Sequence, residues 1–358
     1  MSQPERRAAP VLSVMDMVPV SAGHSRTDAL TDMIALARAA DVAGYEHFWL
    51  AEHHGSTTYL SSATIVLMGQ VLAATERLGV ASGGIMLPNH APLVVAEQIG
   101  TLATLYPGRV ELGLGRAPGT DRLTAAALRR GASDPGHFAE EILEILTYLG
   151  DEPVPERLPG SLLLGASSAP DVAAQMPGPD APRVRAIPGE GTHPTVWVLG
   201  SSVNGARVAG RLGLPFAVAS HFAPVQAEAA IATYRSVLES RAEEAQGAQA
   251  LRPVPRVAAA VNVMVAPSQD EARFLFSTAM AAAARIVGNR PAPLDPPTED
   301  PQAWRAYAPG REAAVETAMS LSFVGTADDV ASRLRELADR WDLDEILVVT
   351  YAHDPALR

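Results

Sequence analysis

The feature that most constrains this chain is a regular alternation between short apolar runs and longer amphipathic segments. The short runs, which we expect to be strands, occupy residues 11–17, 47–51, 79–84, 109–113, 195–199, 216–219, 256–265 and 345–350. The longer segments, which we expect to be helices, cover residues 28–43, 62–75, 92–105, 137–149, 203–212, 225–243, 269–285 and 327–341. This order is typical of parallel strands joined by crossover helices.

The number of predicted strands, eight, favours a closed cylinder over an open sheet, because closure removes both exposed edges. The sequence therefore predicts an α/β protein with a (β/α)₈ TIM barrel fold and loop insertions, with a doubly wound open sheet as the alternative. In the first helix, we expect Thr27 to be the N-cap and Gly44 to end the helix.

Two stretches rich in proline and glycine interrupt the alternation, at about residues 151–194 and 286–322. Both are too long and too loop-like for ordinary connections, so we interpret them as insertions on the barrel. Single α/β barrels commonly exceed about 250 residues. We therefore expect one domain that spans residues 1–358.

The composition narrows the functional classes. The formal net charge of -12 disfavours nucleic-acid binding, because it repels phosphate backbones. The chain contains no cysteine, which excludes disulfides and thiolate chemistry and is compatible with the reducing cytoplasm, where we expect the protein. We expect neither a secretion signal nor a membrane span.

Ionisable groups follow the second predicted strand, where Glu52, His53 and His54 precede a glycine. At a strand end these groups could supply a general base, an anion-binding imidazolium or part of a metal site. Adjacent histidines on a strand point to opposite sides, so a shared metal is the minor interpretation. For His54, packing and hydrogen bonding in the core is as strong an alternative as function, whereas for His53 we favour function.

Small residues follow the third and fourth strands. Gly83 and Gly84 would let the backbone approach a flat ring closely, with a plain bulge or turn as an equal alternative. Gly115 and Arg116 belong to a loop that suits a phosphate, since exposed N–H groups and a guanidinium both favour oxyanions. Taken alone, Arg116 could equally be a structural ion-pair partner.

The fifth strand leads through Ser201, Ser202 and Gly205 into a helix. A helix start offers free N–H groups and the positive end of the dipole, which together make an anion site. The alternative, ordinary N-capping, accounts for one serine and leaves the other unexplained. After the sixth strand, Ser220 precedes His221, which either lines a pocket or caps the barrel rim.

Taken together, these segments resemble the luciferase-like flavin monooxygenases across nearly the whole chain. The similarity is carried, in family order, by residues 45–55, 95–110, 113–121 and 199–222. Each stretch alone is weak support for the family, but few unrelated sequences would contain all four in this order and at this spacing.

The resemblance implies a role for each candidate residue. His53 takes the place of the family's active-site histidine, with His54 as a second catalytic candidate. Gly83 and Gly84 fall where the family often has a non-prolyl cis peptide against the flavin. The implied cofactor-binding set is Gly83, Gly84, Gly115, Arg116, Ser201, Ser202, Gly205 and Ser220, and no metal is implied.

The implied activity is oxidation of a small organic substrate by reduced FMN and O2 through a C4a-peroxyflavin. A separate flavin reductase would supply the reduced FMN, and the protein would be a homodimer. Three alternatives remain open: a deazaflavin-dependent dehydrogenase on the same fold, a non-catalytic flavin-binding protein, and a hydrolase or isomerase with a metal at Glu52, His53 and His54.

Two features depart from the family's pattern. The chain ends seven residues after Tyr351, so we expect the helix after the last strand to be missing or vestigial. Barrel closure is then expected to rely on a partner subunit or on the insertions. In addition, a proline-heavy segment, residues 291–309, replaces the long loop that usually covers the family's pocket.

Overall fold

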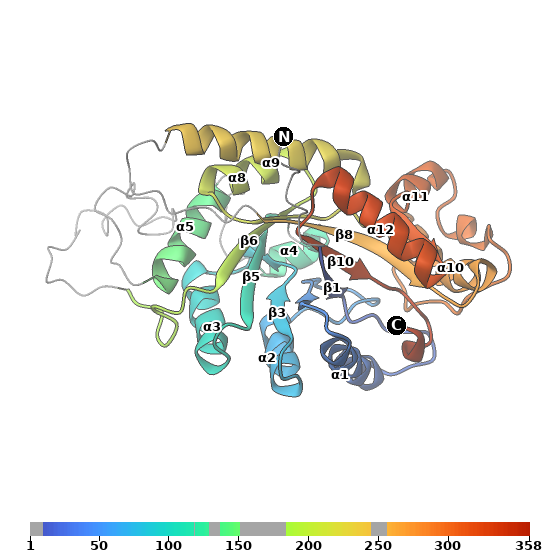
Figure 1. Ribbon diagram of the computed structural model, residues 1–358. Helices are drawn as coiled ribbons and strands as arrows, with labels where there is room; N and C mark the ends of the chain where they lie inside the picture. The colour runs from blue at the N-terminus through green and yellow to red at the C-terminus, as the bar shows by residue number, and fades with distance from the viewer. Residues whose placement is uncertain (1–9, 118, 129–136, 151–183, 245–255) are drawn as a thin grey trace, which may run out of the picture.

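The closed barrel predicted from the strand count is confirmed. The computed structural model describes residues 10–117, 119–128, 137–150, 184–244 and 256–358. Within them, parallel strands pair in sequence around a cylinder, and the last strand pairs with both the first strand and β8 (Figure 1). The barrel strands are β1 (Val11–Asp16), β2 (His47–Leu50), β3 (Gly79–Ser82), β5 (Val110–Gly115), β6 (Thr195–Gly200), β7 (Phe216–Val218), β8 (Val257–Val265) and β10 (Glu345–Val349).

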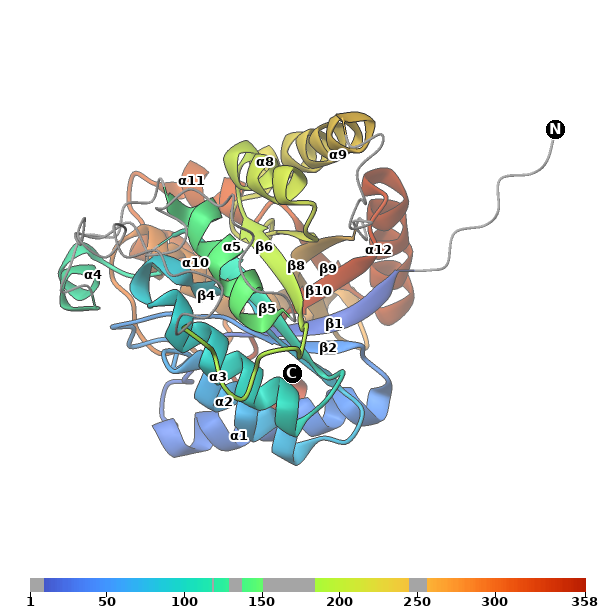
Figure 2. The ribbon, with the colours of Figure 1, turned by 90° about the vertical axis from the view of Figure 1, so that its left-hand side faces the viewer.

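Helices surround the outside of the barrel, as Figure 2 shows from a second direction. Those between successive barrel strands are α1 (Arg26–Ala43), α2 (Thr64–Ala74), α3 (Pro92–Leu105), α4 (Arg122–Leu128), α5 (Phe138–Leu149), α8 (Val203–Leu212), α9 (Ala227–Glu244) and α12 (Ala327–Trp341). Short 3₁₀ turns lie at η1 (Leu87–Asn89) and η3 (Pro224–Gln226). The predicted helix ends agree with the observed ones to within two residues, and α4 was not predicted.

The start of α1 corrects one prediction. Ser25, not Thr27, is the N-cap, because its hydroxyl accepts a hydrogen bond from the backbone N–H of Asp28 at 3.1 Å. The Asp28 carboxylate in turn accepts from the backbone N–H of Ser25 at 2.8 Å, which completes a capping box. Gly44 ends the helix as predicted, with a φ of 80°.

The interior of the barrel is packed by two large rings among small side chains. Trp49 and Trp197 meet edge to face, with ring centroids 5.3 Å apart. The alanines that share their cluster leave room for the two indoles. These alanines are Ala51, Ala81, Ala217, Ala258 and Ala260.

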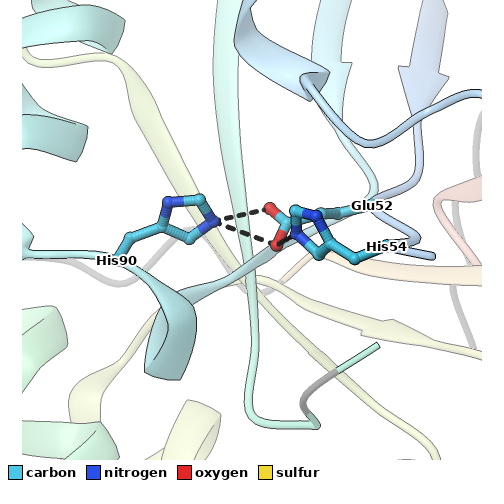
Figure 3. A group of neighbouring side chains, drawn as sticks. All are labelled: Glu52, His54 and His90. Carbon is cyan, nitrogen blue, oxygen red and sulfur yellow. Dashed lines mark hydrogen bonds and ion pairs between the residues drawn. The ribbon is translucent and has the colours of Figure 1, made fainter. Parts of the chain in front are cut away.

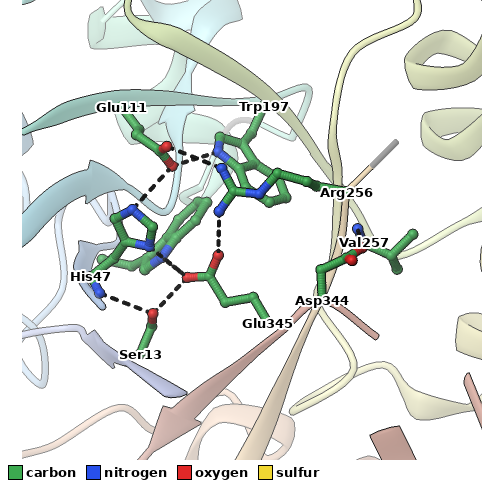
Figure 4. A network of polar contacts seen from close by, with 9 residues as sticks. Ser13, His47, Glu111, Trp197, Arg256, Val257, Asp344 and Glu345 are labelled. Atoms are coloured by element: carbon green, nitrogen blue, oxygen red, sulfur yellow. Dashed lines mark hydrogen bonds and ion pairs between the residues drawn. The ribbon is translucent and has the colours of Figure 1, made fainter. Parts of the chain in front are cut away.

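A polar network closes the end of the barrel where the strands begin (Figure 4). At its centre the fully buried Glu345 accepts hydrogen bonds from Ser13 (2.6 Å), from His47 Nδ1 (2.9 Å) and from the Trp49 indole (3.0 Å). Arg256 lies 3.1 Å from the other oxygen of Glu345. The network therefore joins side chains from β1, β2 and β10 with the residue before β8.

Between β8 and α12 the chain builds a layer outside the barrel. It consists of α10 (Gln269–Val287), η4 (Ala303–Tyr307), α11 (Glu312–Ala318) and β9 (Ser322–Gly325). β9, which was not predicted, pairs with the last residues of β8 beyond the barrel. The insertion predicted at 286–322 begins inside α10 and ends at β9, while most of the one predicted at 151–194 lies outside the described residues.

The proline-heavy segment is bound to the loops after β1 and β2. The backbone of Leu294 exchanges hydrogen bonds with Val20 and Ala22 at 2.7 and 2.8 Å. The hydroxyl of Thr58 donates to the carbonyl of Ala292 at 2.7 Å. The segment thus packs beside the C-terminal ends of the first two strands.

Barrel closure is complete within this chain. β10 pairs with β1 on one side and with β8 on the other, so neither a partner subunit nor an insertion takes part, and that expectation was wrong. After β10 the described chain forms only the turn η5 (Pro355–Leu357). In the described part of the chain, no helix has the length and apolar character needed to cross a membrane.

Candidate active site

A cavity of about 490 Å³ opens at the C-terminal ends of the barrel strands. This is the end at which (β/α)₈ enzymes carry their working groups, because the loops after the strands converge there. Its wall is mainly apolar, and the larger apolar side chains that line it are Met15, Met17, Tyr59, Met86, Phe138, Leu199, Phe222, Ile286, Leu347 and Tyr351.

One side of the cavity carries hydroxyl groups, a helix start and a guanidinium, which are groups that favour an oxyanion. Ser201 and Ser202 line it at the start of α8, and Ser202 is the N-cap residue. Within the described residues the Ser202 side chain makes no capping hydrogen bond, so ordinary N-capping does not account for its hydroxyl. Arg116 lines the same cavity, is exposed, and has no ion-pair partner in the described chain.

Glycines allow the backbone to come close at this side. A Cβ on Gly205 would lie 3.3 Å from the Cα of Gly200, so α8 begins against the end of β6. A Cβ on Gly115 would lie 2.9 Å from the sulfur of Met86. Gly115 and Gly205, which the resemblance implies as cofactor-binding residues, both line the cavity.

The cis peptide expected from the resemblance is present between Gly83 and Gly84. It separates β3 from the short strand β4 (Ile85–Met86), which pairs with β5. Gly83 lines the cavity, whereas Gly84 packs behind it, where a Cβ would lie 2.8 Å from the carbonyl oxygen of Gly113. Only one of the two glycines is therefore placed to meet a ligand.

His53 lies on the cavity wall just after β2. Its ring packs beside Tyr59, with centroids 5.1 Å apart, and its backbone N–H donates to the carbonyl of Ser61 at 3.2 Å. Its Nδ1 is buried and has no hydrogen-bond partner in the described chain. Burial lowers the pKa of His53 to about 4, although the Glu52 carboxylate opposes the shift. The imidazole is therefore neutral at pH 7 and able to accept a proton.

His54 points elsewhere and is not among the residues that line the cavity. Its Nε2 lies 2.8 Å from the buried carboxylate of Glu52, and the Nε2 of His90 lies 2.9 Å from the same group. Figure 3 shows both rings turned toward this carboxylate. The backbone N–H of Met86 also donates to Glu52, at 3.2 Å. Glu52 thus joins the loops after β2 and β3 behind the cavity.

The metal site proposed as an alternative, at Glu52, His53 and His54, is not assembled, because His53 faces the cavity. The set whose ligand atoms lie within 4.8 Å of one another is Glu52, His54 and His90. Its contacts have the lengths of charge-assisted hydrogen bonds. These bonds lower the pKa of Glu52 despite its burial, so the carboxylate is an ionised hydrogen-bond acceptor.

The loop after β7 brings one expected residue to the cavity and withdraws another. His221 lines the cavity, whereas Ser220 does not. The Ser220 side chain is fully buried, and its hydroxyl donates to the carbonyl of Ala260 at 2.7 Å. The expected cofactor contact of Ser220 is therefore replaced by an anchoring bond to β8.

Two tyrosines of the wall were not predicted from the sequence. Tyr59 lies in a loop without a recognisable pattern. Tyr351 follows β10 closely, so the rule that strand ends carry function could have found it. The Tyr351 hydroxyl donates to the sulfur of Met17 at 2.9 Å, and burial raises the pKa of Tyr59 to about 12.

These features define a (β/α)₈ barrel protein in which one cavity is lined by Arg116, Ser202 and the half-buried imidazole of His53. A family model described as luciferase-like monooxygenase matches residues 12–342, and the chain belongs to this family of oxidoreductases. A protein of Escherichia coli (strain K12) named luciferase-like monooxygenase is 38% identical over 337 residues, which are 94% of this chain and 90% of that protein.

Solved structures agree with this assignment. Apo-MsnO8 superposes with a TM-score of 0.78 at 30% identity, covering 98% of this chain and 95% of that one. The oxygenating constituent of 3,6-diketocamphane monooxygenase from Pseudomonas putida, solved in complex with FMN, gives a TM-score of 0.63. At 18% identity, with 98% of this chain and 95% of that chain covered, it shows the common fold alone.

Proposed function

We propose that this protein is a flavin-dependent monooxygenase that uses reduced FMN and O2 to oxidise a small organic substrate. The observation that carries the proposal is a single cavity with an oxyanion site at Arg116 and Ser202 and a desolvated imidazole at His53. The part of the wall at Arg116 and Ser202 suits the phosphate of a cofactor with a flat ring. The part at His53 suits a reacting substrate. FMN is the first choice of cofactor because a structure of the same fold was solved in complex with FMN, while F420-dependent enzymes of this fold keep the deazaflavin as the alternative.

The described residues fit FMN at both of its ends. Ser202 has a hydroxyl that the helix does not use, and Arg116 has a guanidinium without an ion-pair partner in the described chain. Together with the N–H groups at the start of α8, they would hold the phosphate. Gly83 presents backbone without a side chain to the cavity and would lie against the ring. Bound reduced FMN supplies the electrons and the site of reaction with oxygen.

His53 would act as the proton acceptor near the reacting atoms. A base must be unprotonated at the working pH, and the low pKa of His53 keeps the imidazole neutral there. Tyr59 beside it stays protonated, because its pKa is raised to about 12. The surrounding apolar side chains exclude water, which protects reactive species from hydrolysis. For His54 the geometry favours a positioning role through Glu52 over direct catalysis.

We further propose a flavin reductase as the transient supplier of reduced FMN, a homodimeric assembly and a cytoplasmic location. Family membership supports the first two proposals, and the absence of cysteine supports the third. Sedimentation of the purified protein, with and without a reductase, measures the first two directly.

The proposal is tested by titrating the protein anaerobically with photoreduced FMN. We expect Arg116→Gln to weaken binding by about 10- to 100-fold, the value of a charge-assisted hydrogen bond. Arg335→Gln, which changes an exposed arginine of α12 away from the cavity, serves as the matched control. Oxygen consumption is then screened over aldehydes, ketones and aromatic polyketides.

Three outcomes would overturn the proposal. Tight binding of a deazaflavin in place of FMN would make the protein a dehydrogenase on the same fold. Flavin binding without formation of an oxygenated product from any of these substrates would make it a non-catalytic flavin-binding protein. Binding that is equally weakened by Arg335→Gln would remove the oxyanion site from the cavity.

A further inference from the structure

We propose that His221 is a substrate-binding residue, and that with His53 it makes the cavity select uncharged substrates that carry a hydrogen-bonding oxygen. The inference rests on the proposed function, since it names the substrate class that the same cavity admits. Both histidines line the cavity at strand ends other than those of the oxyanion site: His221 follows β7, and His53 follows β2.

The position of His221 is fixed by the neighbouring strand. The side-chain amide of Asn262 on β8 donates to the backbone carbonyl of His221 at 2.6 Å. One residue earlier, the hydroxyl of Ser220 donates to the carbonyl of Ala260 on the same strand at 2.7 Å. The ring also packs edge to face on Phe222, with centroids 4.8 Å apart. Hydrogen bonds to β8 at two successive residues, together with packing on Phe222, hold the His221 ring in a defined orientation at the cavity.

Neither nitrogen of the His221 ring forms a hydrogen bond within the described part of the chain. His221 is only 6% exposed, and its Nδ1 is buried without a hydrogen-bond partner in the described chain. The Nδ1 of His53 is in the same state. In neither ring does Nε2 form a hydrogen bond within the described chain, so this nitrogen is free to bind a ligand. Two such rings lining one cavity therefore point to a polar group of the ligand.

The protonation state of the pair sets the charge that this group can have. Burial, together with the nearby His53, lowers the pKa of His221 to about 3. Both rings are therefore neutral at pH 7, and each offers one N–H donor and one nitrogen acceptor. Neutral imidazoles hydrogen-bond a carbonyl or hydroxyl but do not compensate a charge.

The rest of the wall agrees with an uncharged ligand. Among the described residues that line the cavity, Arg116 alone carries a charge, and it belongs to the proposed phosphate site. No carboxylate of the described chain lines the cavity, so a cationic substrate would find no counterion there. Moving a charge into such an apolar site without a partner is strongly unfavourable. A neutral body with one oxygen function is what the wall accommodates.

The test measures binding of three matched probes to the FMN-saturated protein by calorimetry: naphthalene, 1-naphthol and 1-naphthoate. We expect 1-naphthol to bind about three- to tenfold more tightly than naphthalene, the value of one net hydrogen bond. We expect 1-naphthoate to bind at least about tenfold more weakly than 1-naphthol. Affinity for 1-naphthol should be unchanged between pH 6 and pH 8, because neither imidazole titrates there.

Variants assign the preference to His221. In His221→Phe the advantage of 1-naphthol over naphthalene should shrink to less than about twofold, while naphthalene itself binds as before. His221→Asn, which keeps one donor and one acceptor, should restore part of it. His24→Asn makes the same chemical change at an exposed position outside the cavity and should leave all three affinities unchanged.

Two results would overturn this inference: equal or tighter binding of 1-naphthoate, or a full 1-naphthol preference in His221→Phe. The FMN titration on each variant separates these failures from failure of the proposed function. If the wild-type protein does not bind FMN, the proposed function fails, while the probe preference can still be measured on the flavin-free protein.

Discussion

At the scale of single residues, the two cavity histidines lie far from the behaviour of an exposed imidazole. Each is desolvated, and in the described part of the chain neither has a carboxylate as hydrogen-bond partner. His54 and His90, by contrast, use their Nε2 atoms on Glu52. The histidines around this site therefore differ by environment. His53 and His221 are neutral and line the cavity, whereas His54 and His90 hold the loops through Glu52.

The low pKa values make stability depend on pH in a defined direction. Because the folded-state pKa of His221 lies below its usual 6.5, the unfolded chain binds more protons between these values, and stability falls as the pH falls through that range. In His221→Phe, the slope of unfolding free energy against pH near pH 5 should be smaller by about 1.4 kcal/mol per pH unit. Denaturant unfolding between pH 5 and pH 7 measures this, and parallel curves for variant and wild type would contradict it.

His53 is expected to matter for turnover and not for the cofactor. His53→Ala removes the proton acceptor but leaves the oxyanion site, which lies after β5 and β6, untouched. We expect kcat/KM to fall by about 10²- to 10⁴-fold, the usual contribution of general acid–base catalysis. The dissociation constant of FMN, measured by fluorescence quenching, should stay within about threefold. Unchanged turnover would remove the catalytic role of His53.

At the scale of secondary-structure elements, two helix starts use serine in different ways. The Ser25 hydroxyl at the start of α1 is engaged in a capping box, whereas the Ser202 side chain at the start of α8 makes no capping bond in the described chain. Both residues are N-caps with extended backbone. The difference is that only Ser202 lines the cavity, where a ligand can take the place of the missing bond.

This pair gives a matched experiment. Ser25→Ala should lower the free energy of unfolding by about 1 kcal/mol, because a capping bond is lost, and should leave FMN binding unchanged. Ser202→Ala should weaken FMN binding by about tenfold and cost only a few tenths of a kcal/mol in the flavin-free protein. Denaturant unfolding and FMN titration of both variants check this. A large stability loss for Ser202→Ala with normal FMN binding would assign that serine to capping.

At the scale of the whole molecule, the two ends of the barrel have separate tasks. The C-terminal end carries the cavity, and the other end is closed by the network around Glu345 (Figure 4). Burial lowers the pKa of His47, but its hydrogen bond to Glu345 and the charges of Glu345 and Glu111 raise it overall. The network therefore ties the first and last strands together through an imidazole whose protonated form is stabilised by the neighbouring carboxylates.

Glu345→Gln tests the closure. The substitution leaves Glu111 as the remaining carboxylate beside Arg256 and His47 in the described chain, and we expect it to lower the free energy of unfolding by about 3 kcal/mol. Because the folded-state pKa of His47 is raised, its stabilising contribution is complete below about pH 6.5 and is lost as the pH rises through the raised value. The difference between wild type and variant should therefore shrink at alkaline pH.

The control is Glu336→Gln, an exposed glutamate of α12, which should change stability by less than about 0.5 kcal/mol. FMN affinity of Glu345→Gln, measured below the unfolding transition, should equal that of the wild type. A stable Glu345→Gln variant with reduced FMN affinity would show that the two ends are not independent.

The sequence by itself determined the order of strands and helices, the barrel and the strand ends at which function lies. Those features are local: the spacing of apolar residues records which face of each element is buried, and Gly, Ser and Arg after a strand record what the loop can bind. Even the local error at Thr27 arose within one turn of the correct cap, Ser25. His53 and Arg116 could be chosen because each follows its own strand closely.

Only the tertiary structure decided which partners these residues have. His47 and Glu345 are 298 residues apart in sequence and meet because the barrel closes, and His90 reaches Glu52 from another loop. In the closed barrel Ser220 bonds to β8 and His221 lines the cavity, whereas the resemblance implied a cofactor contact for Ser220 and the sequence left the role of His221 open. Contacts across a closed sheet depend on register and strand order, which no single segment contains, so pairings of this kind emerge only when all the strands are in place.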